Sequence, residues 1–179
     1  MMTSVKLDKV RVGCQANAWQ REMKVQENLS EVLRQIAQAG YDGVELPAWS
    51  FPDLDRPQPV RDLVAQYGLA PIAIHLGGNF YEEATFRETT LPAARRTAAA
   101  AAAIGAEGVV LSAAAKRAPL TTVPFDAANP QAAHARPAPT HERKSAEELQ
   151  IQATNLAEVA RLQRDLGLAT YYHNHFTEF

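Results

Sequence analysis

The residues best suited to chemistry stand together in the stretch YYHNHFTEF, at positions 171–179. One asparagine separates His173 from His175, and Glu178 follows three positions later. Imidazole and carboxylate groups bind divalent metals, and they also transfer protons near neutral pH. Two histidines at one strand end are costly to bury without partners, which favours a function. We therefore expect a metal site or an acid–base site here, with a solvated polar tail as the alternative.

Other candidate residues stand upstream, each at or just beyond the end of a short β-rich run. Glu45 lies in GYDGVEL and His75 in IHLGGNF. A hydrogen-bonded structural carboxylate is the alternative for Glu45, and a turn histidine is the alternative for His75. Asn17 and Trp19 suit the lining of a pocket better than catalysis, and Trp19 also suits a core. Ser112 ends another run, but no nucleophile motif surrounds it, so a structural role is expected.

A repeated unit must position these side chains. Four times a helix-like segment ends in glycine and a β-rich run follows, the glycines being Gly40, Gly68, Gly105 and Gly167. Glycine at this place accepts the left-handed conformation that closes a helix. The predicted strands are 10–16, 43–46, 71–76, 108–112 and 169–173.

The helix segments carry their own signals. Asn28 with Glu31, and Ser145 with Glu148, have the spacing of a capping box. In the last helix an inward apolar stripe is expected at Leu149, Ala153, Leu156, Ala160 and Leu166. Residues 113–144 are rich in proline and polar side chains, which predicts a long loop after the fourth strand. Loops of this length are uncommon and are often functional.

Alternating strands and helices predict a parallel sheet with right-handed crossovers. The candidates are an open doubly wound sheet and a (β/α)8 barrel. The first strand places Val12 and Cys14 on one face, and Gly13 and Gln15 on the other. Small and polar inward residues suit a barrel, whose active sites lie at the carboxyl ends of its strands. We expect an arc of polar side chains at one mouth, made by Asn17, Glu45, His75, Ser112 and His173.

The length decides how much of a barrel is present. The chain has 179 residues, whereas a (β/α)8 barrel usually needs about 250. The fold expected is a partial TIM barrel with about five strands and four helices, forming a single domain over 1–179. We expect it to be the N-terminal part of a longer barrel. Its open edges, at the first and fifth strands, predict aggregation or pairing with a second copy.

Composition narrows the function classes. Apolar residues make up 46% and charged residues 21%, with a net charge of −2, as in ordinary soluble domains. This charge gives no general attraction to nucleic acid or to a membrane surface. The single cysteine, Cys14, fits a reducing compartment, and the first residues lack the apolar run of a signal peptide. A cytoplasmic protein is expected.

Three motifs in this order, GYDGVEL, IHLGGNF and YYHNHFTEF, resemble the sugar phosphate isomerase/epimerase family of xylose isomerase-like barrels. The resemblance runs from Val12 to Glu178. It implies a (β/α)8 barrel with one divalent metal, Mn²⁺, Mg²⁺, Co²⁺ or Zn²⁺. Many members carry a glutamate ligand at the fifth strand end, where this sequence has His173. Their other ligands come from strands six to eight, so weak or absent metal binding is expected of this chain alone.

The resemblance also implies the reaction. A sugar, sugar phosphate or inosose would be isomerised or epimerised by metal-assisted proton transfer next to a carbonyl. The implied catalytic residues are Glu45, His173 and Glu178, with His173 also a metal ligand. The implied substrate-binding residues are Asn17, Trp19, His75 and His175.

The expected partner is a small carbohydrate, without nucleic acid or membrane. Two alternatives are a sugar-binding protein without turnover and an inactive truncated barrel. A third is a relative of the apurinic endonucleases, against which the net charge of −2 argues.

Overall fold

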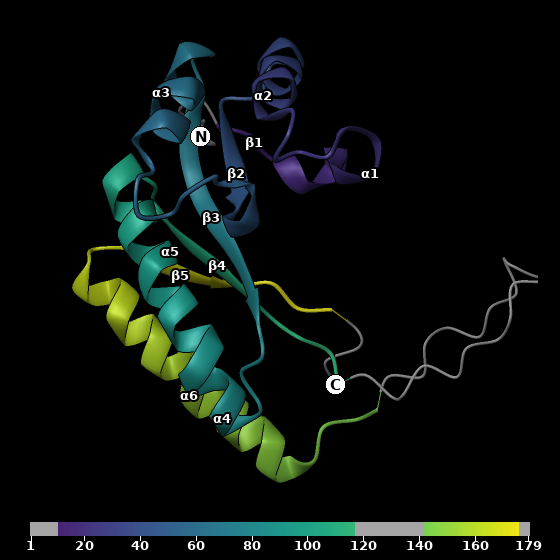
Figure 1. Ribbon diagram of the computed structural model, residues 1–179, viewed down its shortest axis with the longest axis vertical. Coiled ribbons are helices and arrows are strands. Elements are labelled where there is room, and N and C mark those ends of the chain that lie inside the picture. The colour runs from purple at the N-terminus through teal and green to yellow at the C-terminus, as the bar shows by residue number, and fades with distance from the viewer. Residues whose placement is uncertain (1–10, 117–141, 176–179) are drawn as a thin grey trace, which may run out of the picture.

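A computed structural model describes residues 11–116 and 142–175. Its strands form one parallel sheet in the order β1-β2-β3-β4-β5, so each strand pairs with its neighbour in sequence (Figure 1). The strands are β1 (Gly13–Gln15), β2 (Gly43–Pro47), β3 (Ala70–Gly78), β4 (Gly108–Ala113) and β5 (Ala169–Tyr172). The five strands predicted from the sequence are confirmed, with ends that differ by a few residues.

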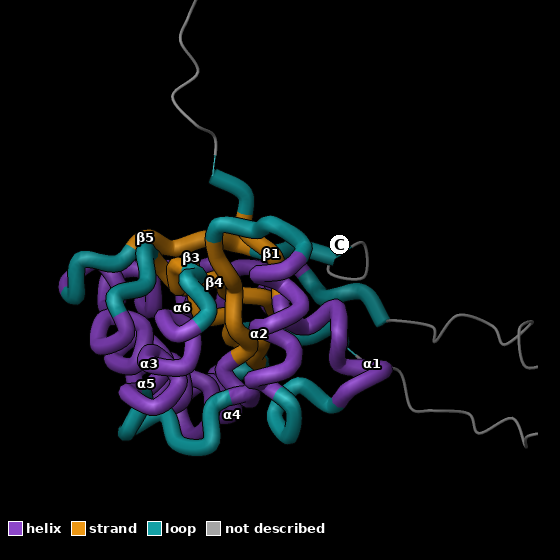
Figure 2. The backbone as a smooth tube through the Cα atoms, turned by 90° about the horizontal axis from the view of Figure 1, so that it is seen from above, coloured by secondary structure: helices purple, strands orange, loops and turns teal. Residues whose placement is uncertain are grey.

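The helices lie on one side of the strands (Figure 2). The crossovers use α2 (Leu29–Gln38), α3 (Gln58–Gln66), α5 (Leu91–Ile104) and α6 (Ala146–Asp165). Shorter elements are η1 (Ala16–Trp19), α1 (Gln20–Met23), η2 (Ala48–Ser50), α4 (Glu83–Thr85) and η3 (Phe86–Thr90). A doubly wound sheet would reverse its strand order and carry helices on both faces. Sequential order with helices on one face is instead the arrangement of a partial barrel.

The main core fills the space between the sheet and these helices. Outward residues of three successive strands are buried there, namely Val44, Leu46, Ile74, Leu76, Val109 and Leu111. They meet the buried faces of α2 and α3, which contribute Val32, Leu33, Ile36, Val60 and Val64. Because the helices cover the apolar outer face of each strand, the polar side chains on the inner face are not part of this core.

One irregularity in β3 shapes the inner face. Val44 pairs with Pro71 but Glu45 pairs with Ala73, so Ile72 is an extra residue in the ladder. The Ile72 side chain lies over the positions where Gly13 and Gly43 would carry a Cβ. Such a bulge changes which residues of a strand share a face.

Gly108, at the start of β4, has backbone packed against it. A Cβ added there would lie 2.4 Å from the carbonyl oxygen of Ala169, its partner on β5. We expect Gly108→Ala to lower the free energy of unfolding by about 1–3 kcal/mol, because the two strands must separate. Urea denaturation would measure this. At Gly77 a Cβ would meet only the Ser112 hydroxyl, at 3.4 Å, so equal losses from Gly108→Ala and Gly77→Ala would contradict the explanation.

The helix ends confirm most of the signals in the sequence. The four predicted glycines all have positive φ, from 68° to 85°. Ser145 and Glu148 form the predicted capping box of α6. The prediction for α2 is wrong: Asn28 makes no side-chain cap and instead donates to the Met23 carbonyl, while Glu31 accepts from Arg34.

The predicted inward stripe of α6 is confirmed only in part, because Leu156 packs against the core and Ala160 is half-buried, whereas the other three residues are exposed. Leu149 and Leu166 are 38% and 46% exposed, and Ala153 is exposed. The buried face carries polar residues with Val159, namely Gln152, Asn155 and Gln163. Asn155 donates to the Phe80 carbonyl and to Glu83, and Gln163 accepts from Thr170. These hydrogen bonds therefore orient α6 against β5 and the segment after β3. A pattern of apolar residues in the sequence does not reveal them.

The predicted long loop, 113–144, falls mostly outside the described residues. At its two described stems, the Glu142 amide donates to the Lys116 carbonyl, and the Lys116 ammonium pairs with Glu148 at 2.9 Å. Within 11–116 and 142–175, none of the helices has the length and apolar character needed to cross a bilayer.

The two outer strands, β1 and β5, each pair on one side only within the described sheet. Tyr171 and Tyr172 on β5 are 45% and 43% exposed. Unpaired strand edges favour pairing with another chain, and self-association stays a prediction. Sedimentation velocity over a range of concentrations would measure it, and a monodisperse monomer throughout would contradict it.

Candidate functional site

Polar side chains from all five strands meet at the carboxyl ends of the sheet. Gln15 ends β1, Glu45 lies on β2 and His75 on β3. Ser112 is near the end of β4, and His173 directly follows β5. Hydrogen bonds join Gln15 to Glu45 and His75, and His75 to Ser112, while the His75 ring also lies beside that of His173. Because parallel strands end at the same edge, residues distant in sequence form one continuous series here.

The first link joins Gln15 to two neighbours. Its amide nitrogen, Nε2, lies 2.5 Å from Oε1 of Glu45 and 3.2 Å from Nδ1 of His75. Gln15 and Glu45 are directly paired across β1 and β2. The Glu45 and His75 side chains are only 22% and 15% exposed, so these contacts are partly shielded from water.

The His75 ring connects this group to β4. Its Nε2 lies 2.9 Å from the Ser112 hydroxyl. An amide N–H can only donate, so the contact from Gln15 leaves Nδ1 of His75 as the acceptor. In a neutral imidazole the other nitrogen then carries the proton, and Nε2–H donates to Ser112. The hydrogen-bond network thus assigns His75 the Nε2–H tautomer.

The histidines beyond β5 complete the series. The His75 and His173 ring centroids are 5.5 Å apart, and those of His173 and His175 are 4.6 Å apart. The Nε2 atoms of His173 and His175 lie 3.1 Å from each other. Two imidazole nitrogens that face one another can share a proton, and they can also serve as two ligands of one metal.

No protein family model matches the chain, and neither does any curated protein. Several solved structures do. A 3-keto-D-glucoside 4-epimerase from E. coli matches with a TM-score of 0.62 and 21% identity, over 92% of this chain and 56% of that one. A D-allulose 3-epimerase from Methylomonas sp., in complex with D-allulose, matches with a TM-score of 0.63 and 15% identity, over 92% and 51%. A fusion of a xylose isomerase-like TIM barrel with a 4-hydroxyphenylpyruvate dioxygenase matches with a TM-score of 0.59 and 18% identity, over 93% and 22%.

The fold is that of part of a TIM barrel. The chain spans about half the length of the two epimerases, in agreement with the five strands described. At these identities the likeness establishes the fold, and the partial barrel predicted from the sequence is confirmed.

The partial barrel brings together four of the residues predicted to take part in catalysis or binding, Glu45, His75, His173 and His175. Asn17 is exposed in η1, apart from these contacts. Trp19 donates its indole N–H to Gln35 of α2 at 2.7 Å and packs against the core. Glu178 lies outside the described residues. The roles predicted for these residues stay predictions.

Two further members of the site were given no chemical role from the sequence. Gln15 was placed on the inner face, and Ser112 was placed in the predicted arc with a structural role expected. The signal for Gln15 was its strand register, because it lies beside Gly13 on the face that also carries Glu45. Ser112 stands opposite Gly77, two residues beyond His75.

The series Ser112, His75, Glu45 has the order of a nucleophile, a base and an orienting carboxylate. A serine nucleophile needs an unprotonated imidazole nitrogen facing its hydroxyl. Here Nε2 of His75 carries the proton, because Nδ1 accepts from Gln15. The arrangement therefore favours His75 as a hydrogen-bond donor over Ser112 as a nucleophile.

The expected metal fits these residues only in part. His173 and His175 could supply two nitrogen ligands. Across 11–116 and 142–175, no three histidine, cysteine or acidic side chains lie close enough to hold one ion. The described residues therefore supply less than the three protein ligands that a metal site usually needs.

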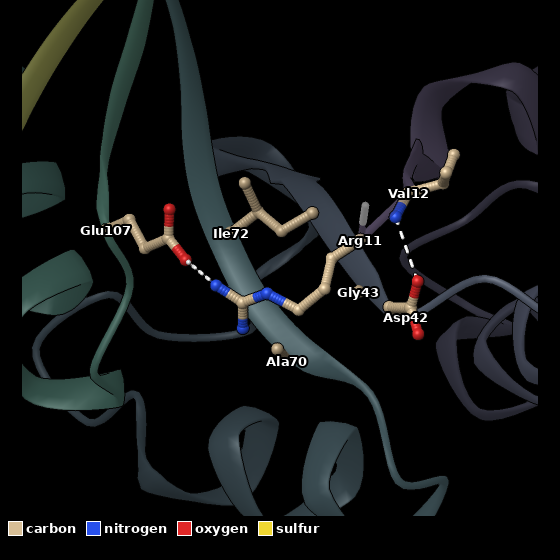
Figure 3. A pocket seen from close by; sticks show the side chains of 7 residues that line it. All are labelled: Arg11, Val12, Asp42, Gly43, Ala70, Ile72 and Glu107. Carbon is tan, nitrogen blue, oxygen red and sulfur yellow. Dashed lines mark hydrogen bonds and ion pairs between the residues drawn. The ribbon is translucent and has the colours of Figure 1, made fainter. Parts of the chain in front are cut away.

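A separate cavity of about 280 Å³ lies at the opposite, amino-terminal ends of the strands (Figure 3). It is lined by Arg11, Val12, Asp42, Gly43, Ala70, Ile72 and Glu107. Arg11 reaches across to Glu107 at 3.2 Å, and the Val12 amide donates to Asp42. Both side chains of the Arg11–Glu107 pair are mostly exposed, so this pair has the character of a surface ion pair.

His75 predicts a pH dependence of stability. Burial lowers its pKa below the ordinary 6.5; the nearby Glu45 raises it, and His173 and His175 lower it further. On acidification the unfolded chain therefore takes up a proton at His75 before the folded chain does, which favours unfolding. The contribution of His75 to stability is complete above about pH 6.5 and is lost as the pH falls toward the pKa of the folded state. We expect the free energy of unfolding to drop more between pH 7.5 and pH 5 in the wild type than in His75→Gln. Equal drops in urea titrations would contradict this.

Proposed function

We propose that this chain belongs to a sugar isomerase or epimerase, in which the residues at the carboxyl ends of β1–β5 transfer a proton next to a substrate carbonyl. The proposal is supported chiefly by the partly shielded contact of Glu45, Gln15 and His75. The fold of the chain is also shared with solved sugar epimerases, one of them in complex with D-allulose. The substrate class proposed is a small carbohydrate with a carbonyl and a neighbouring hydroxyl.

Glu45 is the proposed base. Its Oε1 accepts from Gln15, and no described residue donates to its Oε2. A carboxylate with one oxygen held and the other available can remove a proton from a carbon beside the carbonyl. The C–H electron pair then forms the enediolate, and the proton stays on Glu45 until it returns to the same or the adjacent carbon.

His75 is the proposed donor to the substrate oxygen. Its Nε2–H bonds Ser112, and a sugar oxygen placed at the rim could take over that bond. A neutral imidazole donor can stabilise the charge that develops on a carbonyl oxygen. His173, whose ring lies 5.5 Å from that of His75, is the proposed second acid–base group, and His175 the proposed contact to substrate.

A divalent metal, Mn²⁺, Mg²⁺, Co²⁺ or Zn²⁺, is proposed to bind weakly beside His173 and His175, because the described residues supply only these two ligands together. Such an ion would polarise the sugar carbonyl when bound. Isothermal titration with each ion, for the wild type and His173→Ala, would test this. Equal binding by both proteins would overturn it.

The reaction can be tested by solvent exchange. The protein is incubated in D₂O with a panel of ketoses and aldoses, with each metal ion and with a chelator. We expect deuterium beside the carbonyl of at least one sugar, together with its epimer or isomer, seen by NMR. Absence of exchange in every sugar and ion would overturn the proposed reaction.

A sugar-binding protein without turnover is the second candidate. It is favoured by the incomplete set of metal ligands within the described residues. Saturable binding of a sugar in calorimetry, without deuterium exchange, would support this candidate over the enzyme.

A further inference from the structure

The amide of Gln15 contacts two groups that also lie close to each other. Glu45 Oε1 and His75 Nδ1 are 3.4 Å apart, and Gln15 Nε2 lies 2.5 Å from the first and 3.2 Å from the second. All three side chains come from adjacent strands, β1, β2 and β3. Gln15 is therefore held at this place by the sheet register itself.

The orientation of the Gln15 amide follows from Glu45. A carboxylate accepts hydrogen bonds and donates none, so the NH₂ end of the amide must face it. That nitrogen carries two hydrogens, one for Glu45 and one for Nδ1 of His75. An N–H that points at Nδ1 excludes a proton on the same nitrogen.

Without Gln15 the opposite tautomer would be favoured. Nδ1–H of His75 could then donate to Glu45, which lies within reach after a small shift. Charge-assisted hydrogen bonds of this kind are stronger than neutral ones. Nε2 would lose its proton and accept from the Ser112 hydroxyl, so the direction of the hydrogen bond at the rim would reverse.

We propose that Gln15 is a positioning residue that holds His75 in the Nε2–H tautomer, so that the imidazole donates to substrate oxygen and Glu45 stays available as the base. This assignment rests on the proposed function for its role in turnover, but the tautomer itself is a property of the ligand-free protein. Gln15 acts through His75 and Glu45 and touches no reacting atom.

The test reads the two ring nitrogens of His75 by ¹⁵N NMR at pH 7.5 in ligand-free protein. The His75 signals are assigned by their loss in His75→Gln. In the wild type we expect Nδ1 to show the shift of an unprotonated nitrogen and Nε2 that of a protonated one. In Gln15→Leu and Gln15→Met, which lack both donors, we expect the two assignments to exchange.

Two different apolar substitutions guard against a variant that fails to fold, and circular dichroism checks each. Gln66→Leu is the matched control, because Gln66 is exposed on α3 and its loss should leave the His75 shifts unchanged. An Nδ1–H tautomer in the wild type, or an Nε2–H tautomer retained in both folded variants, would overturn the assignment.

The same variants separate this inference from the proposed function. If the tautomer exchanges but no sugar shows deuterium exchange in the wild type, Gln15 has the proposed effect on His75 and the proposed reaction is wrong. If the wild type exchanges deuterium and the tautomer is insensitive to Gln15, the reaction stands and Gln15 has only a structural part.

Discussion

Replacing Glu45 by glutamine is expected to lower the rate of solvent deuterium exchange into a sugar substrate by about 10²–10⁴-fold, the usual contribution of a positioned general base. A glutamine in this place keeps the shape of the side chain, and its Oε1 can still accept from Gln15. What is lost is the ability to take up a proton. The loss should therefore appear in kcat, with a smaller effect on KM.

The control for this experiment is Glu88→Gln. Glu88 is exposed in η3 and lies outside the series of contacts at the rim, so its replacement should leave the exchange rate unchanged. Exchange by Glu45→Gln at the wild-type rate would remove Glu45 from the role of base. It would shift that role to one of the histidines that follow β5.

The largest effect on stability is expected from Phe80→Ala, with a loss of about 3–5 kcal/mol in the free energy of unfolding. Phe80 is fully buried beyond the end of β3, and its ring lies 6.0 Å from that of Phe86. Its carbonyl also accepts from Asn155 on α6. Truncation would leave a cavity where the segment after β3 meets the last helix.

Urea denaturation compares this variant with Leu149→Ala, which removes an apolar side chain that is 38% exposed. Surface changes of this kind usually alter stability by less than about 0.5 kcal/mol. A similar loss in both variants would mean that Phe80 packs less tightly than its burial indicates. Because His75 lies on β3, directly before the segment that holds Phe80, its ¹⁵N spectrum is a second readout of any displacement.

The sequence indicated the strands and their common polar edge because both depend on local signals. The glycine after each helix and the short β-rich run that follows it locate β2 to β5. Within these strands, the alternation of side chains assigns Glu45 of β2 and His75 of β3 to the polar face. Sequential strand order then places those side chains at one rim. A repeating unit makes this inference possible from a single sequence.

Features that depend on partners far along the chain were not predictable in this way. The buried face of α6 carries Asn155 and Gln163, whose hydrogen bonds go to Phe80 and Thr170. Gln15 gained its place from cross-strand register, which the strand assignments alone did not fix. Asn28 had the spacing of a cap but bonds the preceding turn instead. In each case a tertiary contact decided between local alternatives of similar energy.

The extra residue in β3 has a consequence for how sequences of this fold can vary. A methyl group at position 13 would clash only with the flexible end of Ile72, whereas at position 43 it would also clash with the Ala70 carbonyl oxygen at 2.7 Å. A larger residue at position 13 should therefore be accompanied by a shorter side chain at position 72. At position 43 no side-chain change nearby would remove the clash, because the clash is with backbone. Paired substitution at the first site and invariance at the second are what an alignment of relatives should show.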